Sequence, residues 1–110
     1  MIIAIDFDST IHNPFDVKKG YKMGVPIKDS VESIRRLKSE GHYIIIFPTW
    51  ADTVVKRQAI VDWLDYFKVP YDDVTSTKPD ADVYLDDRGL HFTSWEQALV
   101  DLEKLNARLS

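Results

Sequence analysis

The first eight residues constrain the fold more than any other part of the chain. Met1-Ile2-Ile3-Ala4-Ile5 is a wholly apolar run, and Asp6-Phe7-Asp8 follows it directly. An apolar run of this kind is typical of a strand buried on both faces, as at the centre of a parallel sheet. Side chains at i and i+2 of an extended chain point the same way, so both carboxylates should emerge on one side where the strand ends. Two like charges so close need a cation or a proton to relieve them, which indicates a chemical site.

Strand and helix patterns alternate along the rest of the chain. Apolar runs predict strands over 43–47, 73–76 and 82–86, and helical periodicity predicts helices over about 30–40, over 51–67 and from the capping-box sequence 93–96 onward. Residues 11–27 carry several Asn, Gly and Pro residues that are typical of turns, and we expect a short flap there. The alternation predicts an α/β fold, a three-layer sandwich around a central parallel sheet.

Length and composition restrict the class of protein. A chain of 110 residues with 45% hydrophobic residues predicts a single domain, 1–110. The net charge of -4 gives no strong nucleic-acid-binding signature. The chain has no cysteine, which excludes disulfides and cysteine-ligated zinc. No apolar stretch approaches the roughly 20 residues that span a bilayer, and the N-terminus lacks the features of a signal peptide. We therefore expect a cytoplasmic protein with no membrane partner.

Polar residues follow the predicted strands at the points where ligands collect in parallel α/β folds. Asp6, Thr49 and Asp86 end three apolar runs, and Lys78 precedes the last of them. The carboxyl ends of parallel strands meet at one edge of the sheet, so these side chains should lie together. A carboxylate that attacks a phosphate ester is opposed by about 4 kcal/mol for each unit of charge repulsion at close range. A magnesium ion held by Asp6 and Asp86 would reverse that effect, which makes phosphoryl transfer the expected chemistry.

The order of these residues resembles the four motifs of the haloacid dehalogenase-like (HAD) superfamily of phosphohydrolases. The matching segments are Asp6-Phe7-Asp8-Ser9-Thr10, Thr49, Lys78-Pro79 and Asp86-Asp87, and the match extends from residue 2 to residue 88. The resemblance implies a Rossmann-like HAD topology, a Mg²⁺ cofactor and a phosphorylated substrate. The segments on either side of Thr49 leave room only for the flap at 11–27 and for one helix, so the chain resembles the small type with minimal or no cap.

The resemblance also implies a role for each motif residue. Asp6 would be the nucleophile that becomes an aspartyl-phosphate, and Asp8 would be the general acid and then the general base. Thr10 would brace the loop and belongs with Thr49 and Lys78 to the phosphate-binding set. The implied metal ligands are Asp6, Asp8, Asp86 and Asp87. Two departures stand out: Ser9 replaces a common glycine, and Trp50-Ala51-Asp52 follows Thr49 where many members have a basic residue.

The leading hypothesis is a magnesium-dependent phosphatase that hydrolyses a phosphomonoester through an aspartyl-phosphate. A nucleotide, a nucleic-acid end, a sugar phosphate and a phosphoprotein all stay open as substrates, as does an oligomeric state. The alternatives are a non-catalytic HAD-like binding protein and a receiver-like phosphoacceptor domain. Receiver domains place an adjacent acid pair first and a lone aspartate later, whereas here the acid-x-acid motif comes first, which favours the hydrolase.

Several other residues near these motifs have two interpretations. Trp50 can stack on a nucleobase or contact the flap. His12, His42 and His91 lack metal-ligand spacing and are expected to be structural or exposed, with His12 close enough to Thr10 to border the site. The flap carries a basic group that can attract an anionic substrate, formed by Lys18, Lys19, Tyr21 and Lys22.

Overall fold

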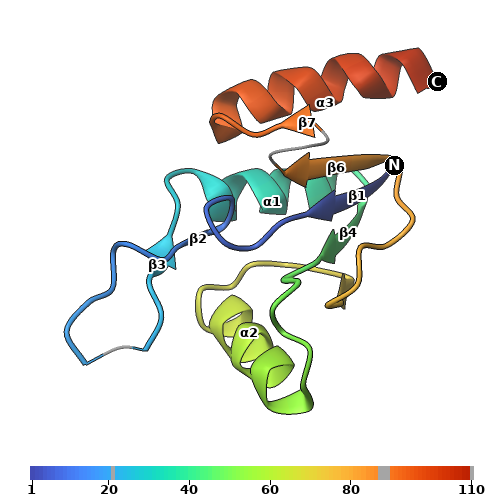
Figure 1. Cartoon of the computed structure of the whole chain (residues 1–110). Helices are drawn as coiled ribbons and strands as arrows, with labels where there is room; N and C mark the ends of the chain where they lie inside the picture. The colour runs from blue at the N-terminus through green and yellow to red at the C-terminus, as the bar shows by residue number, and fades with distance from the viewer. Residues whose placement is uncertain (21, 87–89, 110) are drawn as a thin grey trace.

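The apolar N-terminal run forms the central strand of a parallel sheet. In a computed structural model, which describes residues 1–20, 22–86 and 90–109, β1 (Ile2–Ile5) pairs with β4 (Tyr43–Ile46) on one side and β6 (Val83–Asp86) on the other. The short strands β5 (Asp73–Val74) and β7 (Leu90–His91) form the edges, so the order is β5-β4-β1-β6-β7 and every pairing is parallel (Figure 1). The predicted central strand is therefore confirmed, whereas β7 was not predicted.

The described part of the chain has three helices, and local hydrogen bonds or a glycine mark where each begins or ends. They are α1 (Ser30–Ser39), α2 (Val54–Tyr66) and α3 (Trp95–Leu109). The Thr53 hydroxyl accepts a hydrogen bond from the Lys56 N–H at 3.2 Å and so caps α2. The Ser94 hydroxyl accepts one from the Gln97 N–H at 3.2 Å, one residue later than the expected capping box. Gly41, with φ of 91°, follows α1 in the left-handed conformation that glycine adopts readily. Within the described residues, no helix is long and apolar enough to cross a membrane.

All three helices pack on one face of the sheet. Buried residues of each helix belong to the same hydrophobic cluster as Ile3 and Ile5 of β1 and their register partners Ile44, Ile46 and Leu85. The helical members of this cluster are Ile34, Leu37, Ile60, Trp63, Leu64, Trp95, Ala98 and Leu102. The predicted α/β class and parallel sheet are confirmed, but the expected three-layer sandwich is wrong, since the helices of the described residues form one layer on one face of the sheet.

The opposite face of the sheet is covered by a loop instead of a helix. Tyr84 lies on that face in register with Ala4, and its hydroxyl donates to the carbonyl of Pro79 and accepts the Ala81 N–H at 3.2 Å. The segment 75–82 is too short for a crossover helix, so it runs over this face and leaves Ile2 and Tyr43 exposed near its edge. The missing helix in this crossover is the physical reason for the two-layer arrangement.

The predicted flap forms a small antiparallel hairpin beyond the carboxyl ends of the strands. β2 (His12–Asn13) pairs with β3 (Val25–Pro26), and Figure 1 shows the flap extending from the edge to which the β1 and β6 arrowheads point. The Trp63 indole N–H of α2 donates to the Gly24 carbonyl at 2.9 Å, which ties the flap to the helical layer. Position 21 of the expected basic group lies outside the described residues.

The buried side of α2 differs from the expected one. The helical periodicity of residues 51–67 places Val54 and Val55 on the same apolar side as Ile60 and Leu64 and so predicts their burial, but they are 85% and 80% exposed. Both belong to the first turn of α2, which lies away from the sheet in Figure 1, whereas Ile60, Trp63 and Leu64 reach the core. Helical periodicity alone does not show where along a helix the contact with the sheet begins.

We expect Leu64→Ala to lower the free energy of unfolding by about 2–5 kcal/mol, because Leu64 is fully buried between α2 and the sheet and its truncation leaves a cavity. Urea denaturation followed by circular dichroism measures the change. The matched control is Val55→Ala on the same helix, which should change stability by no more than about 0.5 kcal/mol. Equal losses in the two variants would contradict the assigned packing of α2.

Candidate active site

Two aspartates lie at neighbouring strand ends on the carboxyl edge of the sheet. Asp86 is the last residue of β6, and Asp6 directly follows β1, whose Ile5 is in register with Leu85. The Asp6 backbone N–H donates to the Leu85 carbonyl at 3.0 Å, so the parallel pairing continues up to these two residues. Neighbouring strands are about 4.8 Å apart, which brings two acidic side chains from opposite ends of the chain together.

The segment after Asp6 turns tightly around one carbonyl group. The Phe7 carbonyl accepts the backbone N–H groups of Thr10, Ile11 and His12 at 3.3, 2.9 and 3.0 Å. Ser9 lies at the top of this turn with φ of 63°, in the left-handed region. This conformation explains why glycine suits the position and why serine there carries a strain cost. Within this turn, Asp8 lies near Asp6, and both residues line the same cavity.

Asp8 is held at both of its carboxylate oxygens. Oδ1 accepts a hydrogen bond from Nδ1 of His12 at 2.8 Å, and Oδ2 accepts one from the indole Nε1 of Trp50 at 2.6 Å. Trp50 belongs to a turn after β4 that the Ala51 N–H closes by donating to the Pro48 carbonyl at 2.9 Å. The loop after β1, the flap strand β2 and the turn after β4 therefore converge on one carboxylate.

A cavity of about 300 Å³ opens above these residues, lined by Asp6, Asp8, Ser9, Thr10 and Phe92. Four of its five lining residues come from the acid-x-acid motif and its immediate continuation. Phe92 lies just after β7, and its N–H donates to the Asp86 carbonyl at 3.2 Å. The aromatic side chain thus lies beside the carboxylates because β7 extends the sheet past Asp86.

Lys78 lies against Asp86, as the sequence predicted. Its Nζ is 3.3 Å from Asp86 Oδ2 and lies 4.4 Å from the centre of the Tyr84 ring. The Asp86 side chain is only 7% exposed, whereas that of Lys78 is 47% exposed. The ammonium group can therefore neutralise a buried carboxylate and still be reached by an anion from solvent.

The two threonines of the predicted phosphate site differ in their surroundings. Thr10 is buried and lines the cavity, and its carbonyl accepts the Trp95 indole N–H at 2.9 Å, which supports a bracing role. Thr49 is exposed on the turn that carries Trp50. Among the residues that the structure describes, neither Thr49 nor Lys78 lines the cavity itself.

The predicted metal ligands are only partly within the described structure. Asp6, Asp8 and Asp86 lie at the carboxyl edge, but Asp87 lies outside the described residues. Within residues 1–20, 22–86 and 90–109, no group of three or more His, Cys, Asp or Glu side chains is close enough to hold a metal ion. Magnesium often takes only one or two protein carboxylates and completes its shell with water, so the pair Asp6 and Asp86 is of the right chemical kind.

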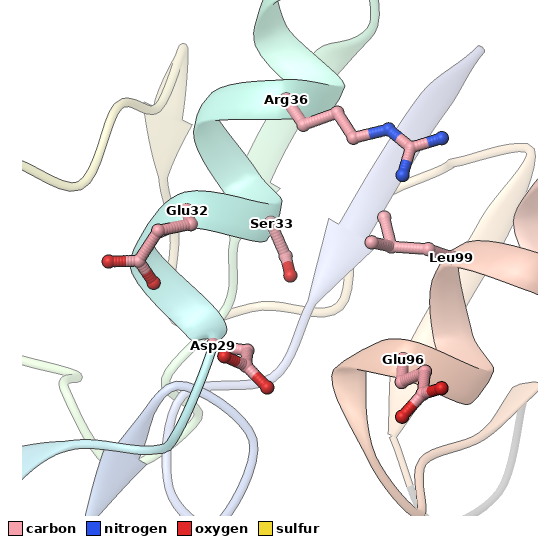
Figure 2. Close-up of a pocket in the computed structure, with 6 residues that line it drawn as sticks. All are labelled: Asp29, Glu32, Ser33, Arg36, Glu96 and Leu99. Atoms are coloured by element: carbon pink, nitrogen blue, oxygen red, sulfur yellow. The ribbon is translucent and has the colours of Figure 1, made fainter.

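A second cavity, of about 320 Å³, lies between α1 and α3. Figure 2 shows Arg36 and Leu99 at one end of it and the carboxylates of Asp29 and Glu96 at the other. Its lining holds three carboxylates against one guanidinium and no residue from a strand end. The cavity at the carboxyl edge is lined by the acid-x-acid motif at a strand end, where ligands collect in parallel α/β folds, and is therefore the better candidate for the site.

Sequence reasoning missed three features of the site. Trp50 makes a contact that neither of its two interpretations included, since its indole N–H donates to Asp8. His12 does border the site, but through Asp8 and not through Thr10. Phe92 had no signal because β7 was not predicted. The i, i+4 spacing of Asp8 and His12 was visible in the sequence, but spacing has meaning only once the backbone conformation between the two residues is known.

Comparisons with known proteins support the fold. No protein-family profile and no curated protein matches the chain. The structure is similar to that of a conserved protein coded by a locus of Bacteroides thetaiotaomicron, with a TM-score of 0.74 and 21% sequence identity over 94% of this chain and 90% of that chain. At this level of identity the likeness shows a shared α/β fold and nothing about activity.

We expect Ser9→Gly to raise the free energy of unfolding by about 1 kcal/mol, because glycine removes the steric cost of the left-handed conformation at this position. Urea denaturation measures the gain. Ser9→Ala is the matched control, since it removes the same hydroxyl but keeps the backbone cost, and it should not be stabilised. A similar gain in both variants would show that the hydroxyl, and not the backbone, is responsible.

Proposed function

We propose that the protein is a magnesium-dependent phosphatase that hydrolyses a phosphomonoester through an aspartyl-phosphate on Asp6. The observation that carries this proposal is the convergence of Asp6, Asp8 and the ion pair of Lys78 with Asp86 at one edge of a parallel sheet, beside a cavity of about 300 Å³. A nucleophile, a proton donor and a cation are the groups that phosphoryl transfer to a carboxylate requires.

We further infer that the fold is of the HAD type and has a minimal cap. The supporting features are the order β5-β4-β1-β6-β7, with the acid-x-acid motif after the central strand, and the small size of both segments in which a cap could be inserted. The first contains the β2–β3 flap, and the second contains α2 and β5. An open site of this kind would accept a phosphate on a large molecule as well as on a small one.

The residues at the carboxyl edge fit a magnesium ion. Asp6 and Asp86 would hold it, since both offer carboxylate oxygens at neighbouring strand ends. When bound, the ion would offset the repulsion between the Asp6 carboxylate and the phosphate oxygens. In the structure Lys78 lies on Asp86, so the same carboxylate would be shared between the ammonium group and the ion.

The first chemical step would use Asp6 and Asp8 in different roles. A carboxylate oxygen of Asp6 forms a bond to phosphorus while the ester P–O bond breaks, and the leaving oxygen takes a proton from the carboxyl group of Asp8. In the second step water attacks phosphorus, the bond between phosphorus and Asp6 breaks, and Asp8 accepts the proton of the water. Phosphate is released, and both carboxyl groups return to their starting states.

Cationic groups near the edge would attract and hold the substrate. Lys78, which contacts Asp86, would donate to the phosphoryl oxygens, and Thr49 on the neighbouring turn is accessible for the same purpose. Lys18, Lys19 and Lys22 of the flap are exposed and add positive charge to one side of the site. The presence of Asp8 as a proposed general acid and base favours hydrolysis over a receiver-like role. In a receiver domain the phosphorylated aspartate has no general acid or base beside it.

We expect Asp6→Asn to abolish magnesium-dependent release of phosphate from p-nitrophenyl phosphate, because an amide cannot attack phosphorus. Phosphate release is measured with and without Mg²⁺, and beryllofluoride binding to the wild type is measured as a mimic of the aspartyl-phosphate. Asp101→Asn on α3, far along the chain from the site, is the matched control and should keep full activity. Full activity in Asp6→Asn would contradict the assigned nucleophile, and an inactive wild type would favour a non-catalytic binding protein.

We expect Asp8→Asn to keep the fold and to slow hydrolysis of an alkyl phosphate by about 10²–10⁴-fold, because a neutral amide cannot supply the proton for an alkoxide leaving group. Nitrophenolate leaves without protonation, so p-nitrophenyl phosphate should still phosphorylate Asp6, and the phosphorylated protein should accumulate. Rapid-quench kinetics and mass spectrometry measure this. Equal losses on both substrates, with no accumulation, would contradict the role of Asp8.

A further inference from the structure

We infer that His12 is a positioning residue that fixes the carboxylate of Asp8 for proton transfer and couples it to the flap. The inference rests on the proposed phosphatase function and names a residue that the acid-x-acid motif does not include. It is carried by two hydrogen bonds on opposite sides of one imidazole ring. Nδ1 of His12 is 2.8 Å from Asp8 Oδ1, and Nε2 accepts the Gly24 backbone N–H at 2.7 Å.

The contact with Gly24 determines which nitrogen of His12 carries the proton. A backbone N–H can only donate, so the Nε2 atom that it approaches must hold a lone pair. In the neutral ring the proton is then on Nδ1, and His12 donates to Asp8. The flap backbone therefore imposes the tautomer that the carboxylate needs.

The imidazole ring is held rigidly in this orientation. His12 is only 6% exposed, stacks on Phe7 with a centroid distance of 4.9 Å, and meets the edge of Trp63 at 5.4 Å. Trp63 also donates to the Gly24 carbonyl. Its indole therefore packs on the imidazole of His12 and also holds Gly24, whose N–H binds that imidazole. A side chain fixed by packing and by two hydrogen bonds can orient a neighbour within the narrow limits that catalysis requires.

Gly24 can approach the ring only because it has no side chain. A Cβ atom at this position would lie 1.8 Å from the Asn13 carbonyl oxygen and 3.2 Å from Nε2 of His12. The close pairing of β2 and β3 thus brings the Gly24 N–H against the imidazole. The position of the flap and the orientation of Asp8 are thereby linked through one ring.

The two oxygens of Asp8 consequently have different roles. Oδ1 is tied to the buried His12, whereas the partner of Oδ2 is the indole of Trp50, which is 42% exposed. We assign proton exchange with the leaving group and with water to Oδ2, the oxygen on the accessible side. His12 touches neither substrate nor metal in this scheme, and it acts only by holding Oδ1.

Three substitutions of His12 separate its two hydrogen bonds. His12→Phe keeps the aromatic packing on Phe7 and Trp63 but removes both bonds. His12→Asn places an N–H donor near the position of Nδ1, and His12→Gln places an acceptor near that of Nε2. With Mg²⁺ present, rapid-quench kinetics measure how fast each variant is phosphorylated on Asp6 by p-nitrophenyl phosphate and by β-glycerol phosphate, whose alkoxide leaving group needs a proton.

We expect His12→Phe and His12→Gln to slow the phosphorylation of Asp6 by β-glycerol phosphate about tenfold or more, and to slow its phosphorylation by p-nitrophenyl phosphate far less. His12→Asn should restore a large part of the activity on the alkyl ester, because it restores the donor to Asp8. If His12 only holds the flap, His12→Gln should be the variant that recovers, and losses should be equal on both substrates. That pattern would overturn the inference.

The tautomer provides a test that does not depend on activity. In ¹⁵N–¹H spectra of histidine-labelled protein, the neutral His12 ring should carry its proton on Nδ1, whereas a proton on Nε2 would overturn the inference. The two proposals can also fail separately. Wild-type protein without phosphatase activity overturns the proposed function and the role of His12 with it. An active wild type that loses activity in Asp6→Asn, with His12 variants that match the wild type on both esters, overturns the role of His12 alone.

Discussion

The burial of β1 between two parallel neighbours is the constraint on which the rest of the structure depends. Ile3, Ala4 and Ile5 are completely buried, and their register with β4 and β6 brings the carboxyl ends of β1, β4 and β6 to the same edge of the sheet. Asp6 is therefore placed beside Asp86 by the same pairing that builds the core.

Hydrogen bonds from several elements then determine the geometry above that edge. The Phe7 carbonyl gathers three N–H groups and forms the turn that presents Asp8, and His12 and Trp50 hold its two oxygens. Each partner is itself fixed by packing or by backbone contacts within the sheet, the flap or the turn after β4. The proposed acid and base thus depends on parts of the fold that are distant along the chain but adjacent in space.

The one-sided helical layer has consequences for the proposed site. The crossover 75–82 has no helix, so it runs over the second face of the sheet and carries Lys78 to Asp86, where the ammonium group also lies over Tyr84. The helices on the first face hold the flap and the turn after β1 through the indole groups of Trp63 and Trp95. The helical layer therefore supports the turn that carries Asp8, and the crossover 75–82 on the other face supplies the ammonium group of Lys78.

The sequence by itself determined the central strand, the parallel α/β class and the helix positions to within a few residues, since these follow from local periodicity. It also determined that Asp6, Asp86 and Lys78 lie at one edge of the sheet, since the carboxyl ends of parallel strands meet there. Only the tertiary structure decided which face each helix covers, that Val54 and Val55 stay exposed, and that His12 and Trp50 bind Asp8. These outcomes depend on contacts between segments whose relative placement no local pattern encodes. The position of Asp87 lies outside the described residues.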